Sequence, residues 1–130
     1  MKEVSTCGTG NNEVRLPKDV MVKWNNIPIH EVDAWRFAEA IGFGEVEIVF
    51  SNRRTKRRWG SCKWWFNNRP PKLLIYRHSV WVFLHEFAHA ITHLTYGLRA
   101  STHGPEFGST LTMLYDRWAN WAPQNLKPRT

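Results

Sequence analysis

The sequence predicts a small α+β domain in which one helix precedes three strands and two further helices follow them. Its 130 residues are enough for one hydrophobic core. Apolar residues recur at helical spacing in three segments, and short β-like runs bounded by turn residues separate the first of these from the second. Eight tryptophans and a hydrophobic content of 42% argue for a packed globule.

The domain is expected to span residues 26–121. Residues 1–25 are rich in Asn, Gly and Thr and have no sustained periodicity, so they are predicted to be loosely ordered. Residues 122–130, "APQNLKPRT", contain two prolines and few apolar groups, which predicts a loose C-terminal tail.

The first helix is predicted within "IHEVDAWRFAEAIG", where apolar residues have mostly helical spacing and Gly42 provides a natural end. A strand is predicted in "EVEIVF", because Val46, Ile48 and Phe50 alternate with residues of the opposite face. "WGSCKWWF" and "KLLIYR" are two more β-like runs, separated by the turn-forming "NNRPP". Three consecutive strands suggest a small antiparallel sheet. Trp64 and Trp65 should point to opposite faces of it, with at most one in the core.

Two helices are predicted in the second half of the chain. Ser79 is a suitable N-cap for a helix that runs through Tyr96 and ends at Gly97. After a loop, Pro105 is suited to the start of a helix within "HGPEFGSTLTMLYDRWANW".

A formal charge of +7 and a pI near 9.9 suggest an anionic partner. Much of this charge lies in one loop that follows the first strand. Nucleic acid is the anionic partner that this loop would suit, whereas the alternative is a loop that only keeps the protein soluble. The candidate nucleic-acid-binding residues are Arg53, Arg54, Lys56, Arg57 and Arg58.

The cysteine content and the N-terminal sequence suggest a cytoplasmic protein. Cys7 and Cys62 are too few for a disulfide framework, so both are expected to be reduced thiols, with Cys62 in the core. "MKEVSTCGTGNNEVRL" has no apolar stretch of the secretory type, and no apolar run reaches the roughly 18 residues that a bilayer requires. We expect a monomer without membrane association.

Two histidines and a glutamate lie within the apolar segment "VWVFLHEFAHAI". His85 and His89 are four residues apart, so on a helix both imidazoles point the same way and can reach one ion. Glu86 lies one residue further round, where its carboxylate can reach a water molecule at that ion without coordinating it. Without a metal, these groups would each need hydrogen-bond partners among apolar neighbours. The spacing therefore predicts a zinc site of the HExxH type.

A catalytic zinc ion usually has three protein ligands and one open position. His93 would lie about 12 Å along the helix from His85, too far to share the ion, and is expected to line the cleft. Because Gly97 lets the chain turn back, His103 is the preferred third ligand. Glu106 is the alternative, although near a helix start its carboxylate could instead interact with the helix dipole.

The motif "LHEFAHAI", a loop and then "HGPEF" resembles the SprT-like (Spartan-type) zinc metalloprotease family, and "WGSC" is similar to the strand before the active-site helix in that family. The resemblance covers residues 58–107 well and the flanking helices loosely. It implies a minimal zincin-like catalytic domain without the Cys-rich zinc ribbon of many members. It also implies one Zn²⁺ ion held by His85, His89 and His103, with Glu86 as the general base. Family members cleave proteins crosslinked to DNA, so it extends the expected substrates to DNA-associated proteins.

The expected activity is hydrolysis of peptide bonds in a protein or peptide, with zinc activating water and Glu86 passing a proton to the leaving amine. His93, Tyr96 and Tyr115 are alternative donors to the oxyanion. A substrate is expected to add as an extended strand beside "WGSCKWW", taken as the edge of the sheet. Two other functions fit less well: a zinc hydrolase of non-protein substrates, and a nucleic-acid-binding module with a structural metal.

Overall fold

The computed structural model describes residues 27–53, 55, 57–65, 68–97 and 103–126, together with the backbone of residues 3–9. Its elements, in chain order, are β1 (Glu3–Thr9), α2 (Glu31–Ala40), β2 (Glu47–Phe50), β3 (Gly60–Trp65), β4 (Lys72–Ile75), α3 (Val80–Tyr96) and α4 (Pro105–Asn125). The predicted α+β class and the order of helix, strands, helix and helix are confirmed. No helix in the described part is long and apolar enough to cross a membrane.

The sheet is mixed rather than purely antiparallel. Its four strands lie in the order β1-β3-β4-β2, with β3 antiparallel to both β1 and β4, and β4 parallel to β2. The sequence prediction assumed that consecutive strands are neighbours. However, the loop of residues 51–59 is long enough to pass the position that β4 later fills, so β2 and β3 are not paired.

Both predicted loose ends contain regular structure in the described residues. The segment 1–25 includes β1, whose backbone pairs with β3, so the "WGSCKWW" strand is not an edge of the sheet as predicted. The rest of that segment lies outside the described residues. At the other end α4 continues through Asn125, past the predicted boundary at residue 121, and it accommodates Pro123 in its last turn.

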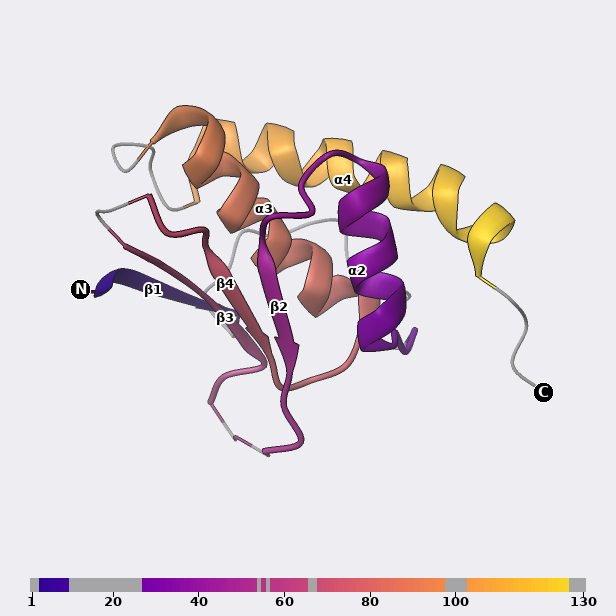
Figure 1. The fold of residues 1–130 in the computed structure, drawn as a ribbon, viewed down its shortest axis with the longest axis horizontal. Helices are drawn as coiled ribbons and strands as arrows, with labels where there is room; N and C mark the ends of the chain where they lie inside the picture. The colour runs from indigo at the N-terminus through magenta and orange to yellow at the C-terminus, as the bar shows by residue number, and fades with distance from the viewer. Residues whose placement is uncertain are drawn as a thin grey trace.

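Helix α3 is the central layer of the molecule. It packs on β1, β3 and β4 with one side and on α4 with another, while α2 packs beside β2. In Figure 1, α3 lies behind the strands and α2 stands next to β2. Because α3 is enclosed by the sheet and α4, all of its residues from Val80 to Thr92 are buried. A polar group on this stretch of α3 is thus held in a largely apolar environment.

Aromatic rings fill much of the core where α2, α3 and α4 meet. Phe37 on α2 makes edge contacts with Phe83 and Phe87 of α3, with ring centroids 6.3 Å apart in each pair. Its ring centroid is 5.1 Å from that of Trp118 on α4. On β3, Trp64 is buried and Trp65 is half-buried, as the alternation of faces predicts. Cys62 is fully buried, also as predicted.

Candidate metal centre

The ends of α3 are set by the two residues that the sequence predicts. The backbone N–H of Val82 donates to the Ser79 hydroxyl at 3.2 Å, which satisfies one of the free N–H groups at the helix start. Gly97 ends the helix with a φ of 82°, a conformation that glycine adopts without strain. These ends fix the helix frame in which the HExxH residues lie.

His85 and His89 face each other from adjacent turns of α3. Their Nε2 atoms are 3.3 Å apart, and both side chains are buried. Two nitrogens that are each about 2.1 Å from one tetrahedral zinc ion lie about 3.4 Å apart. The spacing of the pair therefore fits a shared ion as well as a hydrogen bond between the rings.

His103 completes a cluster with this pair. It lies two residues before α4, whose N-cap is Gly104 and whose first residue is Pro105. Its ring centroid is 4.8 Å from that of His89 and 5.6 Å from that of His85. One candidate ligand atom from each histidine lies within 4.8 Å of the others, so the three residues could hold a metal ion. His103 is only half-buried, which makes it the member nearest to solvent.

Among the described residues, Glu106 is not part of this cluster. It occupies the first turn of α4, where a carboxylate interacts favourably with the helix dipole. Its backbone carbonyl accepts a hydrogen bond from the Thr110 hydroxyl at 2.9 Å. The geometry thus favours His103 over the alternative third ligand that the sequence left open.

Phe107 supports all three histidine rings. Its ring centroid is 4.3 Å from that of His89, in a stacked arrangement, and 5.1 Å from those of His85 and His103. Because Phe107 is fully buried in the first turn of α4, it restricts the orientation of the imidazoles. The sequence could not reveal this role of Phe107, since periodicity does not show which side chains a buried ring will touch.

Burial keeps His89 in the protonation state that a metal ligand requires. Burial lowers the pKa of His89 well below its usual value, and the nearby His85 and His103 lower it further. A neutral imidazole has a nitrogen lone pair available for a metal, whereas an imidazolium does not. His89 is therefore poised as a ligand near neutral pH.

Glu86 is fully buried on the side of α3 that faces β3. The close approach of strand and helix at this point depends on Gly60. A Cβ atom on Gly60 would lie 3.0 Å from Glu86 Cγ and 2.8 Å from Val82 Cγ1. The glycine of the "WGSC" segment therefore lets β3 lie directly against the residue that follows the first histidine, a role that the sequence alone did not reveal.

The three residues named as alternative oxyanion donors lie in different environments. His93 is half-buried and stacks on Trp64 at 4.7 Å, and burial lowers its pKa. Tyr96 is exposed at the C-terminal end of α3. Tyr115 stacks on Trp81, whose ring also contacts that of His85, and burial raises the pKa of Tyr115. His93 is thus outside the histidine cluster, as its spacing predicts.

The basic loop is partly within the described residues. Arg53, Arg57 and Arg58 are exposed, whereas Arg54 and Lys56 lie outside the described residues. A surface pocket of about 380 Å³ opens where this loop meets the ends of β3 and β4. It is lined by Thr55, Arg58, Trp59, Tyr76 and Arg77. The Arg77 guanidinium lies 4.8 Å from the centre of the Trp59 ring, so cationic and aromatic groups share one surface.

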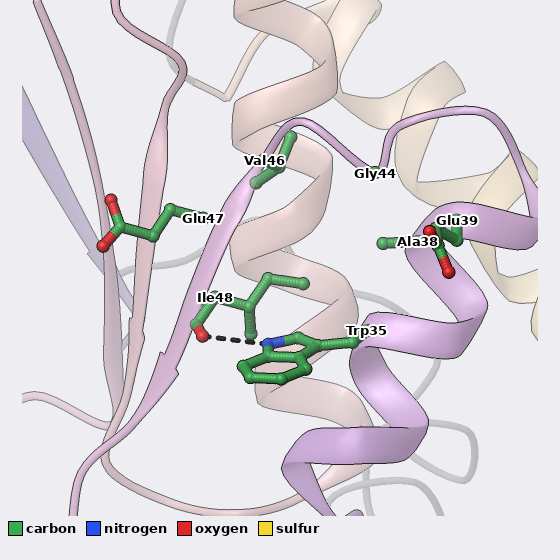
Figure 2. A pocket seen from close by; sticks show the side chains of 7 residues that line it. All are labelled: Trp35, Ala38, Glu39, Gly44, Val46, Glu47 and Ile48. Atoms are coloured by element: carbon green, nitrogen blue, oxygen red, sulfur yellow. Dashed lines mark hydrogen bonds between the residues drawn. The ribbon is translucent and has the colours of Figure 1, made fainter.

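A second pocket, of about 310 Å³, lies between α2 and β2 and is separate from the histidine cluster. Figure 2 shows the side chains that line it, including Trp35 from α2 and Ile48 from β2. Because none of the HExxH residues lines this pocket, it is not the entrance to the candidate metal centre.

Comparison with protein-family models, with curated proteins and with solved structures gives no significant match.

Proposed function

We propose that this protein is a zinc-dependent metallopeptidase of the HExxH type, in which His85, His89 and His103 bind the ion and Glu86 is the general base. The observation that carries this proposal is the convergence of three histidines on one point, with a glutamate on the same buried helix. Zinc is the metal of choice, because three imidazoles with an open fourth position are typical of catalytic zinc sites. A structural zinc site normally has a fourth protein ligand, and no other His, Cys, Asp or Glu joins the cluster among the described residues.

Each residue has a distinct task in this proposal. A bound zinc ion would supply Lewis acidity, which activates water and polarises a carbonyl group. The Glu86 carboxylate would accept a proton from the attacking water and pass it to the nitrogen of the leaving amine. Phe107 keeps the imidazoles oriented, and the half-buried His103 marks the side from which a substrate can reach the site.

The Glu86→Gln variant tests the assignment of the general base. The amide preserves size but does not accept the proton, so we expect full zinc content and an unchanged fold with turnover reduced by about 10²- to 10⁴-fold. Zinc content, circular dichroism and cleavage of an unfolded protein such as casein are the measurements. Glu106→Gln is the matched control and should keep both zinc and activity. Parent-like cleavage by Glu86→Gln would remove Glu86 from the mechanism.

Cleavage assays also separate peptidase activity from the rival hydrolase function. If the zinc-loaded parent hydrolyses simple esters but no protein or peptide, the metal centre serves another substrate class. If zinc binds but no hydrolysis of either class occurs, the metal is structural.

We further propose that the basic loop binds nucleic-acid phosphates and brings DNA-associated proteins to the metal centre. The pocket that combines Arg58 and Arg77 with Trp59 and Tyr76 supports this, because cations contact phosphates and aromatic rings stack on bases. The pocket lies at the start of β3, next to Gly60, so DNA bound there would be close to Glu86.

Replacing Arg53, Arg54 and Lys56 with Gln should weaken DNA binding and reduce its salt dependence, since each lost phosphate contact changes the salt slope by about 0.9 on duplex DNA. Labelled single- and double-stranded DNA titrated at two salt concentrations measures both effects. Arg117→Gln, on the exposed side of α4, controls for a lost charge elsewhere. Equal, salt-insensitive binding by parent and triple variant would contradict the proposal.

A further inference from the structure

The outer strand β2 has its free backbone edge covered by a helix. At the β2 edge, the Trp35 indole N–H donates to the Ile48 carbonyl at 3.0 Å, and the Phe50 N–H donates to the Glu31 carboxylate at 2.6 Å. Figure 2 shows the Trp35 bond reaching across from α2. Ile48 and Phe50 are two residues apart, so both bonds engage the side of β2 that faces away from β4. Helix α2 therefore closes this edge to an added strand.

On the other side of the sheet, the edge of β3 is occupied by the chain's own N-terminal strand. β1 runs antiparallel to β3, with Cα partners from Glu3 opposite Trp65 to Thr9 opposite Gly60 and one irregularity between Glu3 and Ser5. The Thr9 end of β1 is thus paired with the residue that packs against Glu86. β1 also contacts α3 itself. The strand consequently passes along the side of the metal centre.

We propose that the β3 edge is the docking surface for an extended peptide substrate and that β1 is its intramolecular occupant, so that the N-terminal strand competes with substrate. That the docked peptide is a substrate rests on the proposed peptidase function, whereas the docking of a peptide at β3 does not. A strand has two hydrogen-bonding sides, and on β3 one is taken by β4 and the other by β1. A peptide strand that pairs with β3 must therefore displace β1.

The position of β1 in the sequence makes this exchange feasible. Residues 10–26 connect β1 to the first described residues before α2. Because β1 belongs to the same chain as β3, it competes with an added peptide as an intramolecular strand. The pairing of β1 with β3 also indicates how a peptide would bind. Its backbone would be extended and antiparallel to β3, and it would run from Trp65 toward Gly60.

The two cysteines of the chain provide a way to lock β1 in place. Cys7 and Cys62 are Cα partners in the β1·β3 register, and the sequence has no other cysteine. Directly opposed residues in an antiparallel pair have Cα atoms about 4.5–5.5 Å apart, within the range of about 4.4–6.8 Å that a disulfide spans. A small disulfide RSSR can oxidise the pair by exchange, giving one protein S–S bond and two RSH molecules, and dithiothreitol reverses the reaction.

The test measures binding of a fluorescein-labelled peptide with the sequence of residues 1–12, Cys replaced by Ser, to full-length Glu86→Gln protein. Using this variant prevents turnover, so a failure of the peptidase proposal would not disturb the result. Oxidation to the Cys7–Cys62 disulfide should weaken binding at least about ten-fold, and dithiothreitol should restore it. Cys7→Ser protein treated with the same oxidant is the control and should bind unchanged.

A second variant acts in the opposite direction. Thr6→Pro combined with Cys7→Pro removes a β1·β3 hydrogen bond whichever of the two N–H groups faces β3. It should bind the labelled peptide about ten-fold more tightly than the parent, because its own strand competes less well. Equal binding by crosslinked and reduced protein, or no intramolecular disulfide, would overturn the proposal. Disulfide-linked dimers in place of the monomeric crosslink would overturn it too, since β1 would then pair with a second copy.

Discussion

At the scale of single residues, the candidate centre buries most of its polar side chains but not all of them. His85 and Glu86 are 0% exposed and His89 is 4% exposed, whereas His103 is only half-buried. A buried imidazole is costly unless each nitrogen has a partner, and an ion supplies one partner for three rings at once. The one-sided burial leaves His103 as the candidate ligand that meets solvent.

Replacing His103 tests the ligand set directly. His103→Ala should lower zinc affinity by more than about 100-fold. Loss of a side chain that binds the ion directly weakens zinc binding more than loss of a residue that only hydrogen-bonds to such a ligand. Glu106→Ala, three residues further on in the first turn of α4, should keep most of the zinc. Metal analysis of the purified proteins measures both. Full zinc occupancy in His103→Ala would show that another group completes the site.

At the scale of elements, the position of Glu86 depends on how closely β3 can approach α3. Gly60 has no Cβ, and the space that a Cβ would need is taken by Val82, Glu86 and the Leu74 carbonyl. From α4, the ring of Phe107 also helps to form the centre, because it contacts each histidine ring of the cluster. The centre is thus built at the junction of one strand and two helices, rather than within α3 alone.

Gly60→Ala should destabilise the protein. The new methyl group would lie 2.8 Å from Val82 Cγ1 and 3.2 Å from the Leu74 carbonyl oxygen, and a backbone oxygen has little room to move. Overpacking of this kind costs about 1–3 kcal/mol of unfolding free energy, which urea titration can measure.

Gly108→Ala on α4 is the matched control for that experiment. A Cβ there meets no atom within 4 Å. In a helix interior, alanine is favoured over glycine by about 0.5–1 kcal/mol, so this variant should equal or exceed the parent in stability. If Gly60→Ala is as stable as Gly108→Ala, the close approach of β3 and α3 is not a constraint.

At the scale of the whole molecule, His89 of the histidine cluster and His93, which lies outside it, link stability to pH. In the metal-free protein, burial and two neighbouring histidines lower the pKa of His89, and burial lowers the pKa of His93. In the unfolded chain both histidines titrate near pH 6.5. Below that pH the unfolded state therefore binds more protons than the folded state, so acid favours unfolding.

The unfolding free energy of the metal-free protein should accordingly fall as the pH is lowered from 7.5 to 5.5, with little contribution from these groups above about pH 7. Urea titrations at the two pH values measure the change. His89→Gln should show a smaller decrease, because one of the responsible groups is absent. An identical decrease in parent and variant would show that His89 does not contribute.

The sequence by itself determined the class of fold, the limits of α3 and the residues of the candidate metal centre. These features are local: Ser79 caps the helix start, Gly97 permits its end, and the 3.6-residue period brings His85 and His89 together. His103 could be chosen because the break at Gly97 allows the chain to return. Such information is present in short stretches of sequence, so no long-range contact was needed to read it.

Only the tertiary structure decided how the strands are ordered and what lies against the centre. The parallel pairing of β2 with β4, and the pairing of β1 with β3, join segments far apart in the chain. Strand patterns reveal which face of a strand is buried but not which strand is its neighbour, because every backbone offers the same N–H and C=O groups. For the same reason, the contacts of Gly60 with Glu86 and of Phe107 with the histidines emerged only when the elements were packed together.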